Sequence, residues 1–253
     1  MKGLFLTHCG QVRNHNEDAG GVFENKSSQP IAVIADGMGG HQAGDVASML
    51  AVENIKNRWE ETERVEHPDD MEQWFQQTIK ATNEQIYQKS QENKQLEGMG
   101  TTLVAAAMVG NLLTIAHIGD SRLYIARGTQ FEQLTEDHSF VNELVKRGEI
   151  TEGDAEVHPY KNYIIRALGT DQEVDTDVKT LTWEAGDRLL LCSDGLSDKL
   201  SQTELAQFIT ADKGMDEIGQ QLIDLANQRG GEDNISLILI THDGSGSEAG
   251  EPA

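Results

Sequence analysis

Short apolar runs recur along most of the chain, and most of them end at glycine, asparagine, aspartate or serine. Runs of this kind, bounded by turn residues, are typical of buried β-strands. Gly110-Asn111 predicts a tight hairpin between two runs, and Gly119 to Ser121 is expected to continue the meander into the next strand. The pattern predicts strands at residues 3–9, 21–23, 31–35, 101–109, 112–118, 122–126, 131–134, 174–183, 188–192 and 235–241.

Apolar residues spaced three and four apart predict amphipathic helices between these strands. Ser201 and Glu204 have the S-x-x-E spacing of a capping box, which marks the start of one helix. The other helices are expected at residues 43–59, 69–91 and 215–228. This order of elements favours an α+β fold, with antiparallel sheet and helices packed outside it, over alternating βαβ units.

Two segments depart from this pattern. Residues 139–163 contain helical pieces and the dipeptide His158-Pro159 between strands, so we expect an inserted helical flap. Residues 243–253 are rich in glycine, serine and glutamate, a composition typical of a disordered tail. The rest, residues 1–242, is expected to form one domain, which a length of 253 residues allows.

The net charge of the chain limits the kinds of molecule that it is expected to bind. It carries 43 acidic against 20 basic residues, a net charge of −23. This field disfavours nucleic acid and suits cations, although a solvated acidic surface is the simplest explanation of the excess. No apolar run approaches the ~20 residues that cross a bilayer, so no membrane insertion is expected. The two cysteines lie far apart in the sequence and suggest no disulfide framework, so we expect a cytoplasmic location. We also expect a monomer.

Four aspartates lie at the mouths of predicted strands. Asp36, Asp120 and Asp194 each follow an apolar run, and Asp233 stands just before the run at 235–241. Each alone is ordinary turn or helix-cap chemistry. Together, at the edge of an apolar core, they are costly unless a cation neutralises them, and Arg122 is the only arginine close to these loops.

The type of ligand indicates the type of metal. Carboxylates flanked by glycines, with no His or Cys pair at metal spacing beside them, favour Mg²⁺, Mn²⁺ or Ca²⁺ over Zn²⁺. The neighbouring pair His8-Cys9 is better explained as ordinary strand. Several carboxylates around divalent ions suggest a hydrolytic centre in which a bridging water becomes acidic enough to attack.

Two further stretches contribute candidate site residues. Asp36 lies in the glycine-rich sequence ADGMGGH, residues 35–41, which can fold tightly around a small ligand. Arg13 precedes Asn16-Glu17-Asp18 in a polar loop, and a guanidinium is a bidentate clamp for phosphate, although a surface arginine is an equal alternative. Glu17 and Asp18 would ligate the metal or hold its waters.

Eight motifs in order resemble one family over residues 3–241. The sequence is similar to the metal-dependent protein phosphatases of type 2C, particularly the bacterial phosphoserine/phosphothreonine phosphatases of Bacillus-like organisms. The motifs are GQVRNHNEDAGG (10–21), ADGMGGHQAGDVAS (35–48), GMGTTLVAA (98–106), AHIGDSRLY (116–124), LTEDHS (134–139), RALGTD (166–171), LLLCSDGLSDKL (189–200) and GGEDNIS (230–236).

The resemblance implies a four-layer αββα sandwich with two central antiparallel sheets. It implies that Asp36 bridges two metal ions and that the Gly37 carbonyl binds the second. Asp194 and Asp233 would complete the first metal site, and Asp120 with Asp194 would match a third, weaker position. Arg13 would hold the substrate phosphate, Asp18 would orient metal-bound water, and residues 139–163 would form a mobile flap.

The proton donor is less well indicated. Some members of the family carry His directly after the Asp-Gly pair, as the proposed general acid, whereas this chain has Met38 there. His41 lies three residues further on and is a candidate for the same role, with a loop histidine or a helix cap as the alternative. A metal-bound water is the other candidate donor.

The activity implied by the resemblance is hydrolysis of phosphoserine and phosphothreonine in proteins. A hydroxide bridging two Mn²⁺ or Mg²⁺ ions would attack phosphorus in line, without a phosphoenzyme. The expected partners are phosphorylated proteins and a cognate Ser/Thr protein kinase. Two alternatives remain: a metal phosphohydrolase of small phosphoesters, which no purine-binding motif supports, and a non-catalytic binding relative, against which the four intact carboxylates count.

Overall fold

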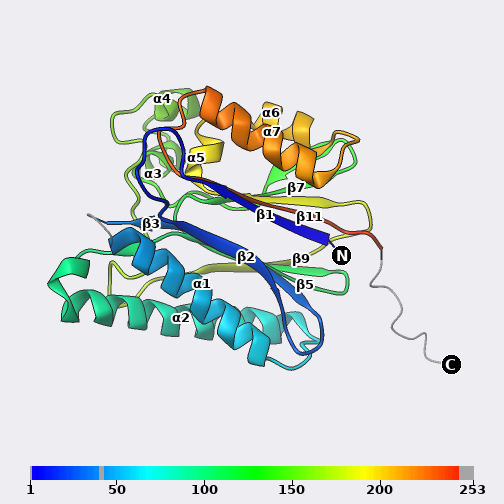
Figure 1. Cartoon of the computed structure of the whole chain (residues 1–253), viewed down its shortest axis with the longest axis horizontal. Coiled ribbons are helices and arrows are strands. Elements are labelled where there is room, and N and C mark those ends of the chain that lie inside the picture. Colours follow the sequence, from blue (N-terminus) through cyan, green and yellow to red (C-terminus); the bar gives the residue numbers. More distant parts are fainter. Residues whose placement is uncertain (1, 40–42, 245–253) are drawn as a thin grey trace.

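Two antiparallel sheets stack face to face in the computed structural model, which describes residues 2–39 and 43–244 (Figure 1). The first sheet has the order β1 (Lys2–His8), β11 (Ile235–Thr241), β10 (Arg188–Cys192), β7 (Arg122–Arg127) and β8 (Gln130–Gln133). The second has the order β2 (Asp18–Glu24), β3 (Pro30–Met38), β5 (Leu103–Val109), β6 (Leu112–Ile118) and β9 (Asp177–Thr182), and β4 (Gly100–Thr101) pairs with the end of β3.

Helices cover both outer faces, which confirms the predicted α+β sandwich of four layers (Figure 1). The outer face of the second sheet carries α1 (Ala43–Glu61) and α2 (Pro68–Glu92), followed by the short 3-10 helix η1 (Lys94–Leu96). The first sheet carries α6 (Gln202–Ile209) and α7 (Met215–Gln228). Three short helices, α3 (Phe140–Lys146), α4 (Glu152–Glu156) and α5 (Asp194–Ser197), lie at the end of the sandwich where α1 begins.

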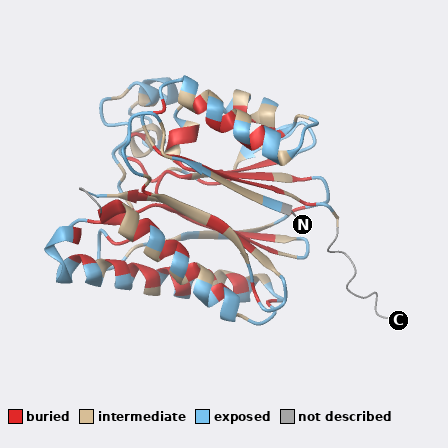
Figure 2. Cartoon of the chain, viewed as in Figure 1, coloured by how far each residue is buried: buried red, intermediate tan, exposed pale blue. Residues whose placement is uncertain are grey.

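The core has three apolar layers, as the buried residues in Figure 2 show. Strand β3 contributes to two of them because successive side chains point to opposite faces of a sheet. Ile31 and Val33 pack with α1 and α2, whereas Ala32 and Ile34 pack between the sheets. A strand buried on both faces reads as a continuous apolar run, which is why the sequence pattern located β3 so readily.

Most predicted elements are confirmed, several of them with the same bounds. Strands β6, β10 and β11 and helix α7 begin and end where the sequence pattern placed them. Ser201 caps α6 through the predicted capping box with Glu204. Among the described residues no helix is long and apolar enough to cross a membrane.

The meander predicted through Gly119 to Ser121 is wrong. Strand β6 belongs to the second sheet and β7 to the first, so the chain changes sheets at this point instead of turning back. Gly119 has φ +104°, and a Cβ there would lie 2.7 Å from Thr102 Cβ. Turn residues alone do not distinguish a hairpin from a crossing between sheets, which tertiary packing decides.

Other elements differ in extent. Strand β2 begins at Asp18, within the stretch interpreted as a polar loop, because it pairs residue by residue with β3. The run expected at 101–109 is divided at Thr102, and β9 is shorter than expected. Helices α5 and η1 are too short to show a period in the sequence.

Residues 139–163 form α3, α4 and a connecting segment. The ends of the segment meet, because Ser139 forms an isolated bridge with Ile164 and Phe140 N donates to Tyr163 O at 2.8 Å. Its motion stays a prediction. Of the expected tail, only Asp243 and Gly244 are among the described residues, and His41 lies outside them.

Candidate metal centre

The pairing of β2 with β3 brings the first two carboxylates together. Asp18 lies directly opposite Asp36 in the register, and the Cβ atoms of such cross-strand partners lie about 5 Å apart. The backbone of Asp36 is held on both sides: its N–H donates to Thr102 Oγ1 at 3.0 Å, and its carbonyl accepts from Thr102 N at 2.9 Å. The position of this carboxylate is therefore determined by the sheet rather than by a loop.

The first sheet contributes two further aspartates. Asp194 is the first residue of α5, separated from β10 by Ser193 alone, and Asp233 lies shortly before the neighbouring strand β11. A Cβ on Gly195 would lie 1.9 Å from Asn234 O and 3.5 Å from Asp233 Cβ. Only glycine at this position lets α5 approach the start of β11 so closely.

Ser193 connects the two sheets at this point. Its hydroxyl donates to Asp18 Oδ2 at 2.8 Å and accepts from Ser236 N at 3.0 Å. The residue occupies the N-cap position of α5, but its side chain is directed to Asp18 and caps nothing. Sequence reasoning missed Ser193, although it stands beside Asp194 in the motif LLLCSD.

Asp120 lies where the chain crosses between the sheets, and it is 9 % exposed. The crossing is fixed by a hydrogen bond between Thr102 Oγ1 and Ser121 Oγ at 2.7 Å. Thr102 also holds Asp36. The same threonine therefore connects the segments that carry both aspartates.

Burial and the charges of nearby acidic groups change the pKa values of these aspartates. Burial raises the pKa of Asp18 to about 6, and the charge of Asp233 adds to the effect. Burial, with the charge of Asp137, raises the pKa of Asp120 to about 7. Burial raises the pKa of Asp36 and of Asp194 well above the ordinary value, and both are raised further by the charges of Asp120 and Asp233. Charges of neighbouring carboxylates thus add to the effect of burial on the pKa values of Asp18, Asp36 and Asp194.

Oxygens in this group lack donors. Within the described part of the chain, Oδ1 of Asp18, Asp120 and Asp194 is buried without a hydrogen-bond partner. A buried acceptor without a partner is costly, and a buried carboxylate more so. An all-oxygen set with acceptors to spare is what Mg²⁺ and Mn²⁺ require, so the residues fit divalent cations.

Arg13 reaches the same group from the loop between β1 and β2. Its Nη2 donates to Asp233 Oδ2 at 2.8 Å and its Nε to Glu232 O at 3.3 Å, with the side chain 48 % exposed. The guanidinium is thus accessible, as a surface arginine would be, and it is also paired with the carboxylate of Asp233.

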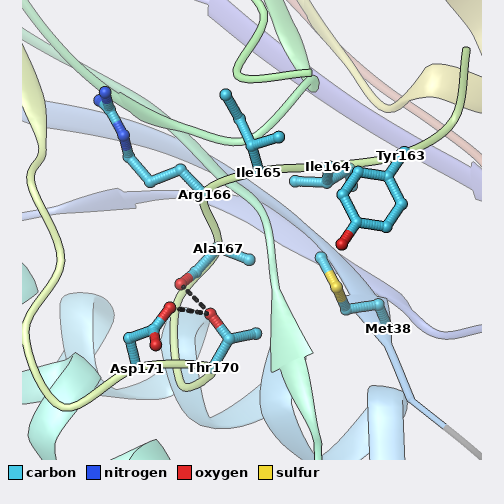
Figure 3. Close-up of a pocket in the computed structure, with 8 residues that line it drawn as sticks. All are labelled: Met38, Tyr163, Ile164, Ile165, Arg166, Ala167, Thr170 and Asp171. Atoms are coloured by element: carbon cyan, nitrogen blue, oxygen red, sulfur yellow. Dashed lines mark hydrogen bonds between the residues drawn. The ribbon is translucent and has the colours of Figure 1, made fainter. Parts of the chain in front are cut away.

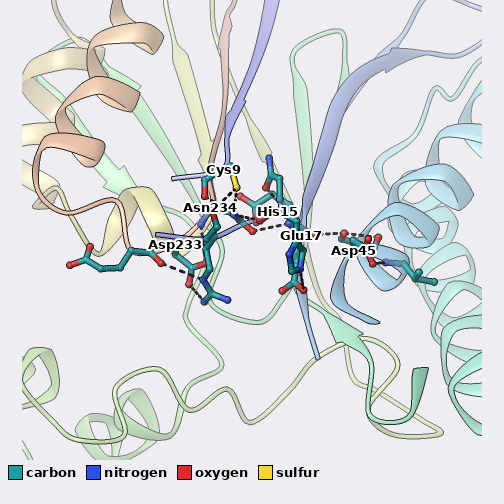
Figure 4. Close-up of polar contacts among 12 residues, drawn as sticks. Cys9, His15, Glu17, Asp45, Asp233 and Asn234 are labelled. Atoms are coloured by element: carbon teal, nitrogen blue, oxygen red, sulfur yellow. Dashed lines mark hydrogen bonds and ion pairs between the residues drawn. The ribbon is translucent and has the colours of Figure 1, made fainter. Parts of the chain in front are cut away.

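Asn234 holds this loop in place, and sequence reasoning missed it as well (Figure 4). Its Nδ2 donates to Cys9 O at 2.9 Å and to His15 O at 3.0 Å, and its Oδ1 accepts from Glu17 N at 2.7 Å. One side chain therefore fixes the loop from Cys9 to Glu17 against the start of β11. The available signal was its place directly after Asp233.

The backbone around Gly37 is packed so closely that the position after Asp36 has room for glycine only. A Cβ on Gly37 would lie 2.1 Å from Gly44 O and 2.7 Å from Glu17 O. The Gly37 N–H donates to Glu17 O at 3.1 Å, which also accepts from Ser48 Oγ at 2.5 Å. Glu17 itself is buried and paired with His15 at 3.0 Å.

A group that the sequence did not indicate lies nearby. Metal-ligating atoms of His117, His138 and Asp177 lie within 4.8 Å of one another. However, His138 Nδ1 accepts from Gly119 N at 3.0 Å, so its Nε2 carries the hydrogen that faces Asp177 Oδ2 at 3.1 Å. Burial lowers the pKa of His138, and it lowers that of His117 to about 3. With Nε2 protonated, His138 supports Gly119 and is unsuited to binding a metal.

Comparison with known proteins gives a consistent result. The family model described as protein phosphatase 2C matches residues 7–239. The chain is 46 % identical over 243 residues to the serine/threonine phosphatase stp of Listeria monocytogenes, covering 96 % of each chain. It is 39 % identical over 241 residues to the protein phosphatase PhpP of Streptococcus pneumoniae, covering 95 % of this chain and 97 % of the other.

Solved structures agree with this result. The crystal structure of a serine/threonine phosphatase from Staphylococcus aureus has a TM-score of 0.91 at 41 % identity, covering 95 % of this chain and 94 % of that one.

Proposed function

The chain belongs to the protein phosphatase 2C family and is a metal-dependent protein serine/threonine phosphatase, and we propose that its catalytic centre is the carboxylate group at the junction of the two sheets. The observation that carries this assignment is the set of buried aspartate oxygens without donors. We assign Asp36, Asp120, Asp194, Asp233 and the Gly37 carbonyl as metal ligands, Arg13 as the phosphate-binding residue, and Asp18 as the residue that orients water.

The proposed cofactors are Mn²⁺ or Mg²⁺, in two or three positions. Asp36 would bridge two ions, Gly37 would bind one of them through its carbonyl, and Asp194 and Asp233 would complete the other. Asp120 with Asp194 would hold the third. When bound, these ions would neutralise phosphoryl oxygens and bring the pKa of water toward neutrality.

The chain's own residues would bind phosphate and handle the proton. Arg13 is accessible beside Asp233, where its guanidinium can donate two hydrogen bonds in bidentate geometry to two phosphoryl oxygens. Asp18, with Oδ2 fixed by Ser193 and Oδ1 buried without a partner among the described residues, is positioned to accept a hydrogen bond from an attacking water and so orient it. His41 lies outside the described residues and stays a proposal as the donor to the leaving group.

Phosphorylated proteins are the substrates that the family implies. A cognate Ser/Thr protein kinase, a cytoplasmic location and a monomeric state are further proposals. The two cysteines are unpaired in the structure, which is compatible with a reducing compartment.

The test replaces Asp36 with asparagine, which keeps the shape and removes the charge. Asp36→Asn should lower kcat for p-nitrophenyl phosphate in Mn²⁺ by about 10³-fold or more, because several kcal/mol of charge stabilisation depend on the metals. Asp70→Asn, on the exposed face of α2, is the matched control and should leave kcat unchanged. Full activity of folded Asp36→Asn, or of the wild type in excess EDTA, would contradict the assignment.

Two measurements address the alternatives. Higher kcat/KM for nucleotides than for phosphopeptides would favour a small-molecule phosphohydrolase. Absence of Mn²⁺ binding in isothermal titration would favour a non-catalytic relative.

A further inference from the structure

A pocket of about 300 Å³ lies beside the end of the strand that carries Asp36 (Figure 3). It is lined by Met38, the segment 163–167, Thr170 and Asp171. None of these residues is assigned to the catalytic centre. The pocket is therefore separate from the metal ligands, and its use depends on where it lies relative to them.

The pairing of β3 with its neighbours determines where the pocket lies relative to Asp36. Met38 follows Asp36 by two residues in β3, so the two side chains share a face and lie about 7 Å apart along the strand. Gly37 pairs with Thr101, and Thr101 in turn exchanges backbone hydrogen bonds with Leu168 at 3.0 and 2.9 Å. The pocket wall is thus attached by a continuous ladder to the backbone of the catalytic strand.

The wall has little freedom to move away. A Cβ on Gly100 would lie 2.8 Å from Thr170 Cγ2 and 3.0 Å from Leu168 O, so β4 packs directly on this segment. Thr170 Oγ1 donates to Ala167 O at 3.1 Å, which closes the turn that carries Asp171. The backbone that carries the lining side chains is consequently held against β4 by hydrogen bonds and close packing.

The lining combines apolar surface with one accessible negative charge. Tyr163 and Ile165 are 60 % and 44 % exposed, so their side chains offer apolar surface to a ligand. Arg166 also lines the pocket, but its Nη1 pairs with Asp177 Oδ1 at 2.8 Å and its guanidinium points away from Met38 in Figure 3. Asp171 is exposed, with Thr170 Oγ1 3.3 Å from its Oδ2.

We propose that this pocket binds a lysine or arginine side chain of the phosphoprotein substrate, one or two residues from the phosphoserine or phosphothreonine. An extended peptide advances about 3.3 Å per residue, so a phosphate at the Asp36 end places such a neighbour at Met38. The aliphatic stem packs on Met38 and Ile165, the Tyr163 ring faces the cation, and Asp171 pairs with it. The net charge of −23 favours the same substrates.

The proposal rests on the proposed function but has its own readout. Phosphopeptides that differ only in one flanking residue, Arg, Leu or Glu, at each of the two positions on either side are compared by kcat/KM. At one or more positions wild type should prefer Arg over Glu by about tenfold, and Asp171→Asn should reduce that preference about three- to tenfold. Asp171→Lys should reverse it, and Glu173→Gln, exposed nearby but not lining the pocket, should leave it unchanged.

Hydrolysis of p-nitrophenyl phosphate separates the two hypotheses. This substrate lacks flanking residues, so Asp171 variants that are folded should hydrolyse it like the wild type. Equal kcat/KM for the Arg and Glu peptides, or a preference for Arg that Asp171→Asn and Asp171→Lys both leave intact, would overturn the pocket assignment while the catalytic centre stands. A preference for Leu over Arg at every position would equally overturn it, since an apolar side chain would then be the occupant.

Discussion

At the scale of single residues, the site is defined by an imbalance of charge. Arg122, the arginine that the sequence placed nearest to the strand-end loops, donates from Nη2 to Asp137 Oδ2 at 2.6 Å and from Nε to both Asp137 oxygens at 3.0 Å. It is thereby largely neutralised by a residue outside the carboxylate group. Buried charges that lack a counter-ion are strongly unfavourable, so a cation bound at this carboxylate group would stabilise the fold.

Arg13 is the residue whose removal tests phosphate binding most directly. Arg13→Ala should lower kcat/KM for p-nitrophenyl phosphate by about 10- to 100-fold, because a hydrogen bond to a charged group contributes about 1.5–3 kcal/mol. The inhibition constant for inorganic phosphate should rise in parallel, while Tm changes little since the side chain is 48 % exposed. Arg64→Ala, which removes an exposed ion pair with Glu66, is the control. Unchanged inhibition by phosphate in Arg13→Ala would assign Arg13 a purely structural role.

At the scale of elements, the site depends on backbone segments that approach more closely than side chains allow. Helix α5 rests on the start of β11 through Gly195, and β3 rests on the start of α1 through Gly37. The first contact joins segments far apart in the sequence, the second joins residues on either side of the loop between β3 and α1, and each has an aspartate next to it. The two glycines therefore help to position aspartates of the proposed metal site, although they have no side chains of their own.

The substitution Gly195→Ala has two opposite effects on stability, one from helix propensity and one from a steric clash, and their relative sizes decide whether the protein becomes more or less stable. Alanine is the better helix former by about 1 kcal/mol, so propensity alone predicts a more stable α5. The added Cβ would instead lie 1.9 Å from Asn234 O, a backbone atom that cannot rotate away. We expect a loss of about 1–3 kcal/mol in unfolding free energy and a higher Mn²⁺ concentration for half-maximal activity, because Asp194 and Asp233 move apart.

The control is Gly153→Ala in α4, where the nearest atom lies 3.9 Å from the new Cβ. That variant should be neutral or slightly stabilised. Thermal denaturation and a Mn²⁺ activation curve provide both measurements. A higher Tm with unaltered Mn²⁺ dependence for Gly195→Ala would show that the contact can relax.

At the scale of the whole molecule, the sequence pattern predicts the layers better than the connections. Strands such as β10 and β11 are apolar on both faces, and α7 has a clear period, so their bounds follow from local composition. Asp18 is different: it lies in β2 only because Ala35 and Asp36 pair with Ala19 and Asp18 across the sheet. Local sequence carries no signal for such pairing.

Local sequence is equally uninformative about contacts between distant segments at the candidate site. The sequence predicts Asp36, Asp120, Asp194 and Asp233 as site residues because each ends or precedes an apolar run. Ser193 and Asn234 were missed because they act across the sandwich, on Asp18 and on the loop after Cys9. Contacts between the sheets become visible only when both sheets are present.

The raised pKa values predict that the metal-free protein loses stability as pH rises. Asp18 and Asp120 have pKa values raised by burial to about 6 and about 7, so the folded state binds more protons than the unfolded state between about pH 4 and 7. Stability from these groups is present at low pH and lost as pH rises through 6 to 7. In EDTA, Tm should therefore fall by about 5 °C or more between pH 5.5 and 8.

Divalent ions should remove or reverse this trend, because they bind the ionised carboxylates and stabilise the fold in proportion to their occupancy. Saturating Mn²⁺ should raise Tm strongly at pH 8 and only slightly at pH 5.5. Asp120→Asn provides the matched variant: without the ionisable group, its Tm in EDTA should depend less on pH than that of wild type and should be higher at pH 8. A wild-type Tm in EDTA that is constant or rises from pH 5.5 to 8 would mean that the carboxylates are ionised at no cost, and the requirement for a cation inferred from their burial would not hold.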